Sequence, residues 1–247
     1  MKKIVCLAFV LFTSVCVFAQ EKTIQKAEFD KMLATSFRLL SRKAHRTTET
    51  HNTQSFWSPK SPLLNVLSTK EITEVLPGVG RYSIYETNSH VGKRNVGKTK
   101  REFFSIGEKQ YTREGEGAWL GRIIKGAAKS QFQSHTLNPL DSSEKYKEYK
   151  FLGNEKLDNQ NTKVYLVIRK PQPATPKTNR PANSKIYPTV KDGTCKYWFG
   201  KDGILLKSEC KTEFYGVLRE SSPLVITHSI KLYELDPKIK ITVPKLD

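Results

Sequence analysis

The chain has 247 residues, of which 42 are lysine or arginine and 24 are aspartate or glutamate, so its formal charge at neutral pH is +18. A chain this basic is attracted to anionic surfaces such as phospholipid headgroups, polyanionic glycans or nucleic acid. The basic residues are scattered along the chain, which argues against a dedicated nucleic-acid groove. The composition is therefore compatible with an anionic membrane surface as a partner, and nucleic acid is disfavoured.

Residues 1–19 predict a secretory signal peptide. Two lysines are followed by an apolar run, and Ala19 supplies the small residue that signal peptidase requires. One alternative is a transmembrane anchor, for which the apolar run falls short of the roughly 20 residues that a span needs. Another is a lipid anchor at Cys16, for which Val15 is a poor preceding residue. We expect an exported protein, periplasmic or extracellular, that is soluble once cleaved near Ala19.

Residues 21–46 predict an amphipathic helix. Its apolar residues recur at steps of three and four, which places them on one face. They are Phe29, Leu33, Phe37, Leu40 and Ala44. Thr23 is the expected N-cap. Packing of this stripe onto a sheet accounts for the pattern fully, and a helix lying on a membrane surface is the alternative.

Most of the remaining chain predicts antiparallel strands joined by tight turns, and segment 101–114 is the clearest example. A two-residue turn at Gly107-Glu108 pairs Arg101 with Glu114, Glu102 with Arg113, Phe104 with Tyr111 and Ile106 with Lys109. These are aromatic and opposite-charge pairs of the kind that stabilise a sheet. A glycine at the first turn position favours a type II′ turn.

Two later segments interrupt the strand pattern. Residues 122–133 have weak helical periodicity and predict a short helical insertion. Residues 171–188 hold five prolines and predict an exposed loop, because proline cannot join the interior of a sheet. Strand patterns resume directly after this loop, so we treat residues 20–247 as a single domain.

Two cysteines remain once the signal peptide is removed, and in an oxidising compartment they predict a disulfide. Asp202-Gly203 favours a type I′ turn, and pairing outward from it brings Cys195 opposite Cys210. In that register the cysteines occupy a hydrogen-bonded pair, where the strands are wider apart, unless a bulge shifts the register. Two free buried thiols are the alternative. A zinc site is disfavoured, because no histidine pair lies nearby.

The sequence offers no recognisable pattern for catalysis. No two histidines have a metal-binding spacing. The five are His45, His51, His90, His135 and His228. A nucleophile elbow and a P-loop are also missing from the sequence. We therefore expect no enzyme activity, no metal and no cofactor; a secreted hydrolase with a site assembled from distant residues is the alternative.

Several stretches resemble the periplasmic lipoprotein-carrier superfamily of LolA/LolB-like half-barrels. They are REFFSIGEKQYTR followed by a tryptophan at 101–119, YKFLGNEKLDN followed by TKVYLV at 149–167, YWFGKDGILLKS at 197–208 and YELDPKIKITVP at 233–244. The resemblance implies an N-terminal helix, an incomplete antiparallel barrel and an apolar or acyl-chain ligand. It rests on strand and turn patterns, so no site residue is carried over, and the long proline-rich loop departs from the family.

The expected fold is α+β: a curved antiparallel sheet forming an incomplete β-barrel, with the N-terminal helix and the helical insertion covering its concave face. Strands twist, so such a sheet curls and its inside must be filled. We expect a non-enzymatic binder or carrier of a lipid, acyl chain or lipoprotein in the cell envelope. The expected cavity lining is Phe29, Leu33, Phe37, Leu40, Phe104, Ile106, Tyr111, Trp119 and Trp198. The alternative is a basic envelope or surface protein with a solid core that binds an anionic partner by charge.

Overall fold

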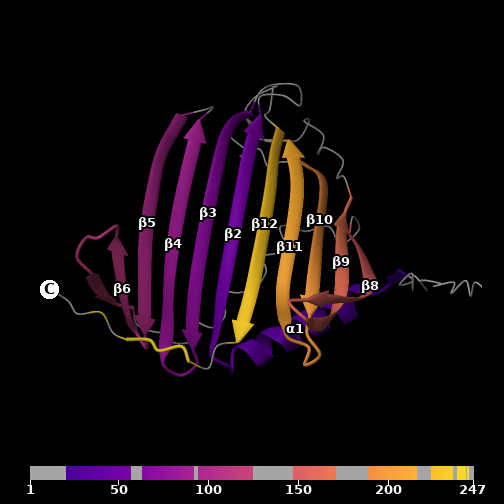
Figure 1. Ribbon diagram of the computed structural model, residues 1–247, viewed down its shortest axis with the longest axis horizontal. Coiled ribbons are helices and arrows are strands. Elements are labelled where there is room, and N and C mark those ends of the chain that lie inside the picture. The colour runs from indigo at the N-terminus through magenta and orange to yellow at the C-terminus, as the bar shows by residue number, and fades with distance from the viewer. Residues whose placement is uncertain are drawn as a thin grey trace, which may run out of the picture.

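The described part of the chain forms one helix and one antiparallel sheet of twelve strands (Figure 1). The computed structural model describes residues 21–56, 63–91, 94–124, 147–170, 189–215, 224–235, 238–242 and 244. The elements are β1 (Lys22–Thr23), α1 (Lys26–Leu40), β2 (His45–Phe56), β3 (Leu63–Leu76), β4 (Gly80–Val91), β5 (Arg94–Ile106), β6 (Lys109–Glu114), β7 (Leu120–Ile123), β8 (Lys147–Leu157), β9 (Gln160–Arg169), β10 (Thr189–Phe199), β11 (Leu205–Tyr215) and β12 (Leu224–Leu235).

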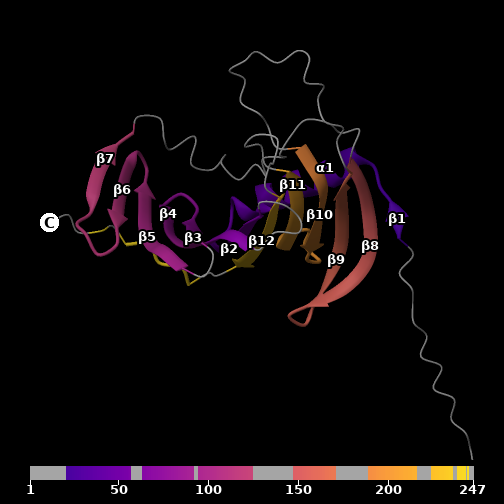
Figure 2. The ribbon, with the colours of Figure 1, turned by 90° about the horizontal axis from the view of Figure 1, so that it is seen from above.

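The strands lie in the order β1-β8-β9-β10-β11-β12-β2-β3-β4-β5-β6-β7. Two runs of sequential strands, β2–β7 and β8–β12, are joined because β2 pairs along its whole length with β12. The order ends at β1 and β7, so the sheet is curved but not closed into a barrel (Figure 2). This confirms the predicted α+β fold with an incomplete antiparallel barrel, the architecture that the resemblance implied.

The helix is shorter at both ends than the predicted range 21–46. Thr23 is not the N-cap, because it lies in β1 and pairs with β8. Gln25 occupies the N-cap position and makes no side-chain capping hydrogen bond. At the other end, His45 already begins β2. Backbone pairing with strands distant in sequence therefore sets both ends of the helix, and helical periodicity alone does not reveal it.

The predicted hairpin at 101–114 is confirmed as β5 and β6 in the predicted register. Gly107 has a φ of 56°, as a type II′ turn requires at that position. The rings of Phe104 and Tyr111 lie 5.7 Å apart between centroids.

The helix predicted at 122–133 is wrong at its start, because Arg122 and Ile123 belong to strand β7. The rest of that segment from residue 125 onward lies outside the described residues. The predicted signal peptide and the predicted loop at 171–188 lie outside them as well.

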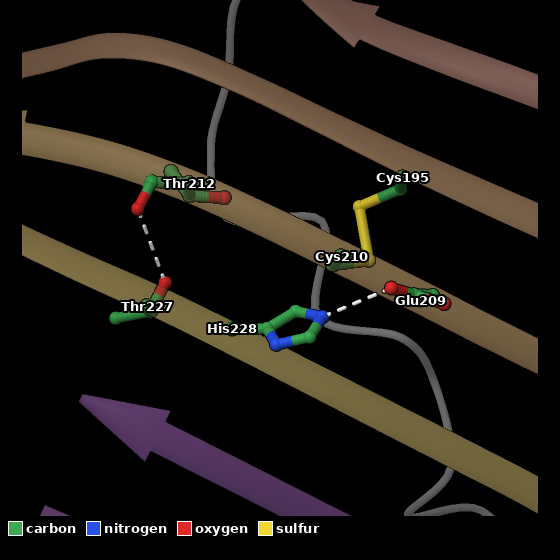
Figure 3. Close-up of a disulfide and its surroundings, with 6 residues drawn as sticks. All are labelled: Cys195, Glu209, Cys210, Thr212, Thr227 and His228. Carbon is green, nitrogen blue, oxygen red and sulfur yellow. Dashed lines mark hydrogen bonds and ion pairs between the residues drawn. A yellow bond between two sulfur atoms is a disulfide. The ribbon is translucent and has the colours of Figure 1, made fainter.

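The disulfide between Cys195 and Cys210 is confirmed, and it joins β10 to β11 (Figure 3). The two Cα atoms are 4.1 Å apart, which fits a non-hydrogen-bonded pair. The predicted type I′ turn at Asp202-Gly203 is wrong, because Gly203 has a positive φ of 78° but Asp202 does not. The exception that was stated for a bulge applies. A bulge between Trp198 and Phe199 shifts the pairing by one residue between the turn and the cysteines.

The core lies between α1 and the half of the sheet formed by β8–β12 (Figure 2). Phe29 is 3% exposed, and its ring centroid lies 5.4 Å from that of Tyr149, 6.3 Å from Tyr165 and 5.1 Å from Tyr197. About two helix turns further on, the Ser36 hydroxyl accepts a hydrogen bond of 2.7 Å from the Leu205 amide. Aromatic packing and this hydrogen bond together fix the helix on the sheet.

Replacement of Phe29 by alanine should lower the free energy of unfolding by about 3–5 kcal/mol, because it leaves a cavity among three tyrosine rings. Urea unfolding followed by circular dichroism measures the change. Lys31→Ala, at an exposed position of the same helix, is the matched control and should change stability by less than about 0.5 kcal/mol. Equal effects of the two substitutions would show that the helix is not docked on the sheet.

Denatured, unreduced protein should carry no thiol label on Cys195 or Cys210, and reduction should expose both. The bond closes a loop of 15 residues, for which the chain-entropy relation gives about 3 kcal/mol of stabilisation. Peptide mapping after iodoacetamide labelling tests the bond, and urea unfolding with and without reductant tests its contribution. A label on either cysteine before reduction would contradict the pairing.

Candidate functional site

Strand register assigns every side chain of the sheet to one of two faces, because directly paired residues point the same way. One ladder of paired residues crosses five strands through Tyr233, Thr47, Thr73, Ser83 and Phe103. Tyr233 belongs to the cluster packed against α1, so we call this side the helix face. Residues between those of the helix face point to the other side, which we call the second face.

The structure separates the predicted cavity-lining residues into three groups. The first group packs in the helix-face cluster: Phe29, Leu33, Phe37 and Leu40. The second group lies at β5 and β6: Phe104, Ile106 and Tyr111, with Trp119 following β6. The third is Trp198 on β10, which lies on the second face.

Phe104, Ile106 and Tyr111 lie on the second face, so they do not share a cavity with the helix residues that were expected to line it with them. Phe103 continues the ladder of the helix face, so Phe104 points to the second face, in a half of the sheet that the helix cluster does not reach. Their role as ligand contacts stays a prediction, as does that of the four helix residues.

The second face is hollowed by a depression of about 850 Å³. It crosses β9, β10, β11, β12, β2 and β3. Its apolar side chains are Val66, Leu166, Trp198 and Ile226. Its polar side chains are Asn52, Gln54, Thr194, Lys196, Glu209, Lys211 and His228. The volume of the depression lies within the range of small-molecule sites.

Trp198 is held in a fixed orientation at one side of the depression. Its indole nitrogen donates a 3.0 Å hydrogen bond to Glu155, and its side chain is 6% exposed. The ammonium groups of Lys196 and Lys207 lie 4.9 and 4.6 Å from the ring centroid. Burial would raise the pKa of Glu155, but hydrogen bonds from Lys196 and Trp198 outweigh it and lower the pKa. The indole is therefore held before any ligand binds.

The charged side chains of the depression differ in how far they are already paired. Glu209 is bound by Lys207 at 2.9 Å. It is also bound by His228 at 3.0 Å (Figure 3). The hydrogen bond from Lys207 is the main cause of the lowered pKa of Glu209. Lys211 lies directly opposite His228 and makes no hydrogen bond or ion pair within the described part of the chain. An exposed, unpaired ammonium group therefore faces the depression.

A second polar cluster lies on the second face of β4, β5 and β6. Glu102 is 2% exposed and accepts hydrogen bonds from the Tyr82 hydroxyl and from Arg113 at 2.7 Å. Lys100 lies 3.2 Å from the same carboxylate. Burial alone would raise the pKa of Glu102, but these hydrogen bonds outweigh it and hold the pKa below its ordinary value. The sequence predicted the Glu102–Arg113 pair, but gave no signal for Tyr82, which lies on a different hairpin.

The described residues bear on two remaining questions, whether the protein holds a metal ion and whether a helix crosses a membrane. Within the ranges that the structure describes, no group of three or more histidine, cysteine, aspartate or glutamate side chains is arranged to hold a metal ion. No helix within those ranges is long and apolar enough to cross a membrane. The expectation that the protein has no metal stays a prediction.

No protein-family model and no curated protein sequence matches this chain. Among solved structures, it is similar to lipoprotein LppX of Mycobacterium tuberculosis at 10% identity and a TM-score of 0.35, over 83% of this chain and 94% of that one. It is also similar to a putative outer membrane lipoprotein-sorting protein domain from Vibrio parahaemolyticus, at 12% identity and a TM-score of 0.24, over 81% and 90%. A β-barrel-like protein of a domain of unknown function from Brucella abortus matches at 11% identity and a TM-score of 0.22, over 78% and 98%. At these values we draw no conclusion about ligand or activity.

Substitution of Glu102 by glutamine should destabilise the protein at neutral pH and much less in acid. A carboxyl group whose pKa is lowered on folding stabilises the fold above its unfolded pKa of about 4.5, and this contribution is lost as the pH falls through the lower, folded pKa. Urea unfolding of both proteins at about pH 7 and about pH 3 measures the difference. Glu114→Gln, at an exposed position, is the control. A loss of stability that is the same at both pH values would contradict the assigned hydrogen bonds.

Proposed function

We propose that the protein is an exported, non-enzymatic binder or carrier of a lipid or acylated molecule in the cell envelope, and that the depression of the second face holds the ligand. The observation that carries this proposal is the hollow of about 850 Å³, whose lining combines apolar side chains with polar and charged ones. The predicted signal peptide supports export. The disulfide supports it too, because such bonds persist in oxidising compartments.

The lining suits a molecule with both hydrocarbon and a polar group. Leu166 and Trp198 lie on the β9–β10 side, and Ile226 and Val66 lie on β12 and β3. Hydrocarbon on these surfaces is removed from water, a gain of about 0.8 kcal/mol for each buried methylene group. The ammonium group of Lys211, which is unpaired within the described ranges, lies between them on β11 and can bind an anionic headgroup. The ligand class that follows is an anionic amphiphile such as a fatty acid or phospholipid.

The helix face between α1 and β8–β12 is a weaker candidate for the same ligand. Phe29 is 3% exposed and Leu40 is 2% exposed, and the tyrosine rings around Phe29 fill the space below the helix. A ligand there would have to displace the protein's own core. We therefore place the site on the second face and retain Trp198, from among the predicted cavity-lining residues, as its anchor.

A brominated fatty acid, 11,12-dibromostearate, should quench the tryptophan fluorescence of the full chain in a saturable way. Trp198→Phe should remove most of the quenching, whereas Trp119→Phe should retain it, because Trp119 does not line the depression. Leu166→Lys should weaken binding by at least about tenfold, since it places a charge where hydrocarbon would lie. Circular dichroism checks that each variant is folded.

The salt dependence of ligand binding distinguishes this proposal from binding by charge alone. Fixed charges are screened over about 10 Å at 0.1 M salt and about 3 Å at 1 M, so attraction to an anionic surface would fall steeply. Contact with hydrocarbon should persist at the higher concentration. Binding that disappears in high salt and is unaffected by Leu166→Lys would instead support a basic protein with a solid core that holds an anionic partner by charge.

A further inference from the structure

A second, smaller cleft of about 310 Å³ lies on the second face where Lys240, Ile241, Thr242 and Pro244 meet β3–β6. It shares no lining residue with the large depression. Phe104 and Trp119 contribute aromatic surface, and Ile241 contributes aliphatic surface. The volume of the cleft is at the lower end of the usual range for ligand sites. It suits a small molecule with one or two rings better than a long acyl chain.

Both carboxylates of this cleft are already neutralised. Glu102 is bound by Tyr82, Arg113 and Lys100. Glu74 is bound by Arg46, whose Nη2 and Nε lie 2.7 and 3.0 Å from the same Glu74 oxygen. The acidic side chains that line the cleft therefore leave little negative charge for a cationic ligand.

The cationic side chains of the cleft, in contrast, retain unused donors. Arg113 donates to Glu102 through Nη2, and 30% of its side chain is exposed. Its Nε is buried and has no hydrogen-bond partner among the described residues. Trp119 holds the guanidinium in place, with its ring centroid 4.8 Å away. Lys240 has no hydrogen bond or ion pair to any residue in the described ranges. The cleft thus presents spare positive charge beside apolar walls.

We propose that this cleft binds a small organic carboxylate with a flat apolar body. The carboxylate accepts hydrogen bonds from the exposed edge of the Arg113 guanidinium and from the Lys240 ammonium group. The apolar body lies between Trp119 and the C-terminal segment at Ile241 and Pro244. Arginine suits this role because its planar group presents several donors in a fixed geometry. The site is independent of the large depression and of the ligand proposed there.

Isothermal titration calorimetry of the full chain with 1-naphthaleneacetate and its neutral analogue 1-naphthaleneacetamide tests the proposal. The acetate should bind at least about tenfold more tightly than the amide, because only the acetate uses the charge of Lys240. Lys240→Met, at an exposed position, should abolish most of this preference. Lys109→Met, an exposed lysine outside the cleft, is the matched control and should leave the preference unchanged.

Two further measurements fix the location of the probe. Trp119→Leu should weaken the binding of both probes, whereas Trp198→Phe should change neither. The acetate should also fail to displace dibromostearate from the large depression. Absence of binding by either probe, equal affinity for the two, or a preference that survives Lys240→Met would overturn the proposal.

Discussion

The docking of Phe29 among Tyr149, Tyr165 and Tyr197 is the contact on which the rest of the structure depends. These three tyrosines come from three adjacent strands, and one phenylalanine from the helix holds them together. Because the helix occupies one face of β8–β12, the alternation of each strand leaves the neighbouring residues on the second face. Trp198 lies there for this reason, directly after Tyr197 in the chain.

Because β2 pairs with β12, the helix face and the second face continue from one half of the sheet into the other. This pairing joins the half covered by the helix to the hairpins β2–β7, and the ladder from Tyr233 to Phe103 stays in register throughout. As a result, the large depression and the small cleft lie on the same face but over different strands. A lipid-binding role for one and a small-carboxylate role for the other can therefore coexist in one protein.

The sequence predicted those features of the fold that depend on residues close together in the chain. The hairpin at 101–114 follows from Gly107 and the residues that flank it. Cys195 lies opposite Cys210 as predicted, but the turn differs from the predicted one and a bulge between Trp198 and Phe199 offsets the difference. The ends of the helix could not be predicted, because distant strands set them. Side chains along a strand alternate between the two faces of the sheet, so Phe104 and Ile106 share one face. The alternation does not show which of the two faces the helix covers.

The candidate site was predicted only in part for the same reason. Trp198 was identified as a lining residue, but its neighbours in the depression come from strands more than 100 residues apart in the chain, such as β2 and β10. A local pattern carries no signal for such an assembly. Likewise, Glu102 and Arg113 were paired correctly from one hairpin, whereas Trp119 and the C-terminal segment reach that pair only through the tertiary fold.

The central claim is that the ligand lies on the face opposite the helix, and photo-cross-linking tests it most directly. A stearate analogue with a diazirine on its chain would be bound to the full protein and activated by light, and the adducts would be mapped by mass spectrometry. The account predicts adducts on Leu166, Trp198 and Ile226, which line the depression. Adducts confined to Leu33, Phe37 or the tyrosines below the helix would contradict it, because they would place the ligand in the core that Phe29 fills.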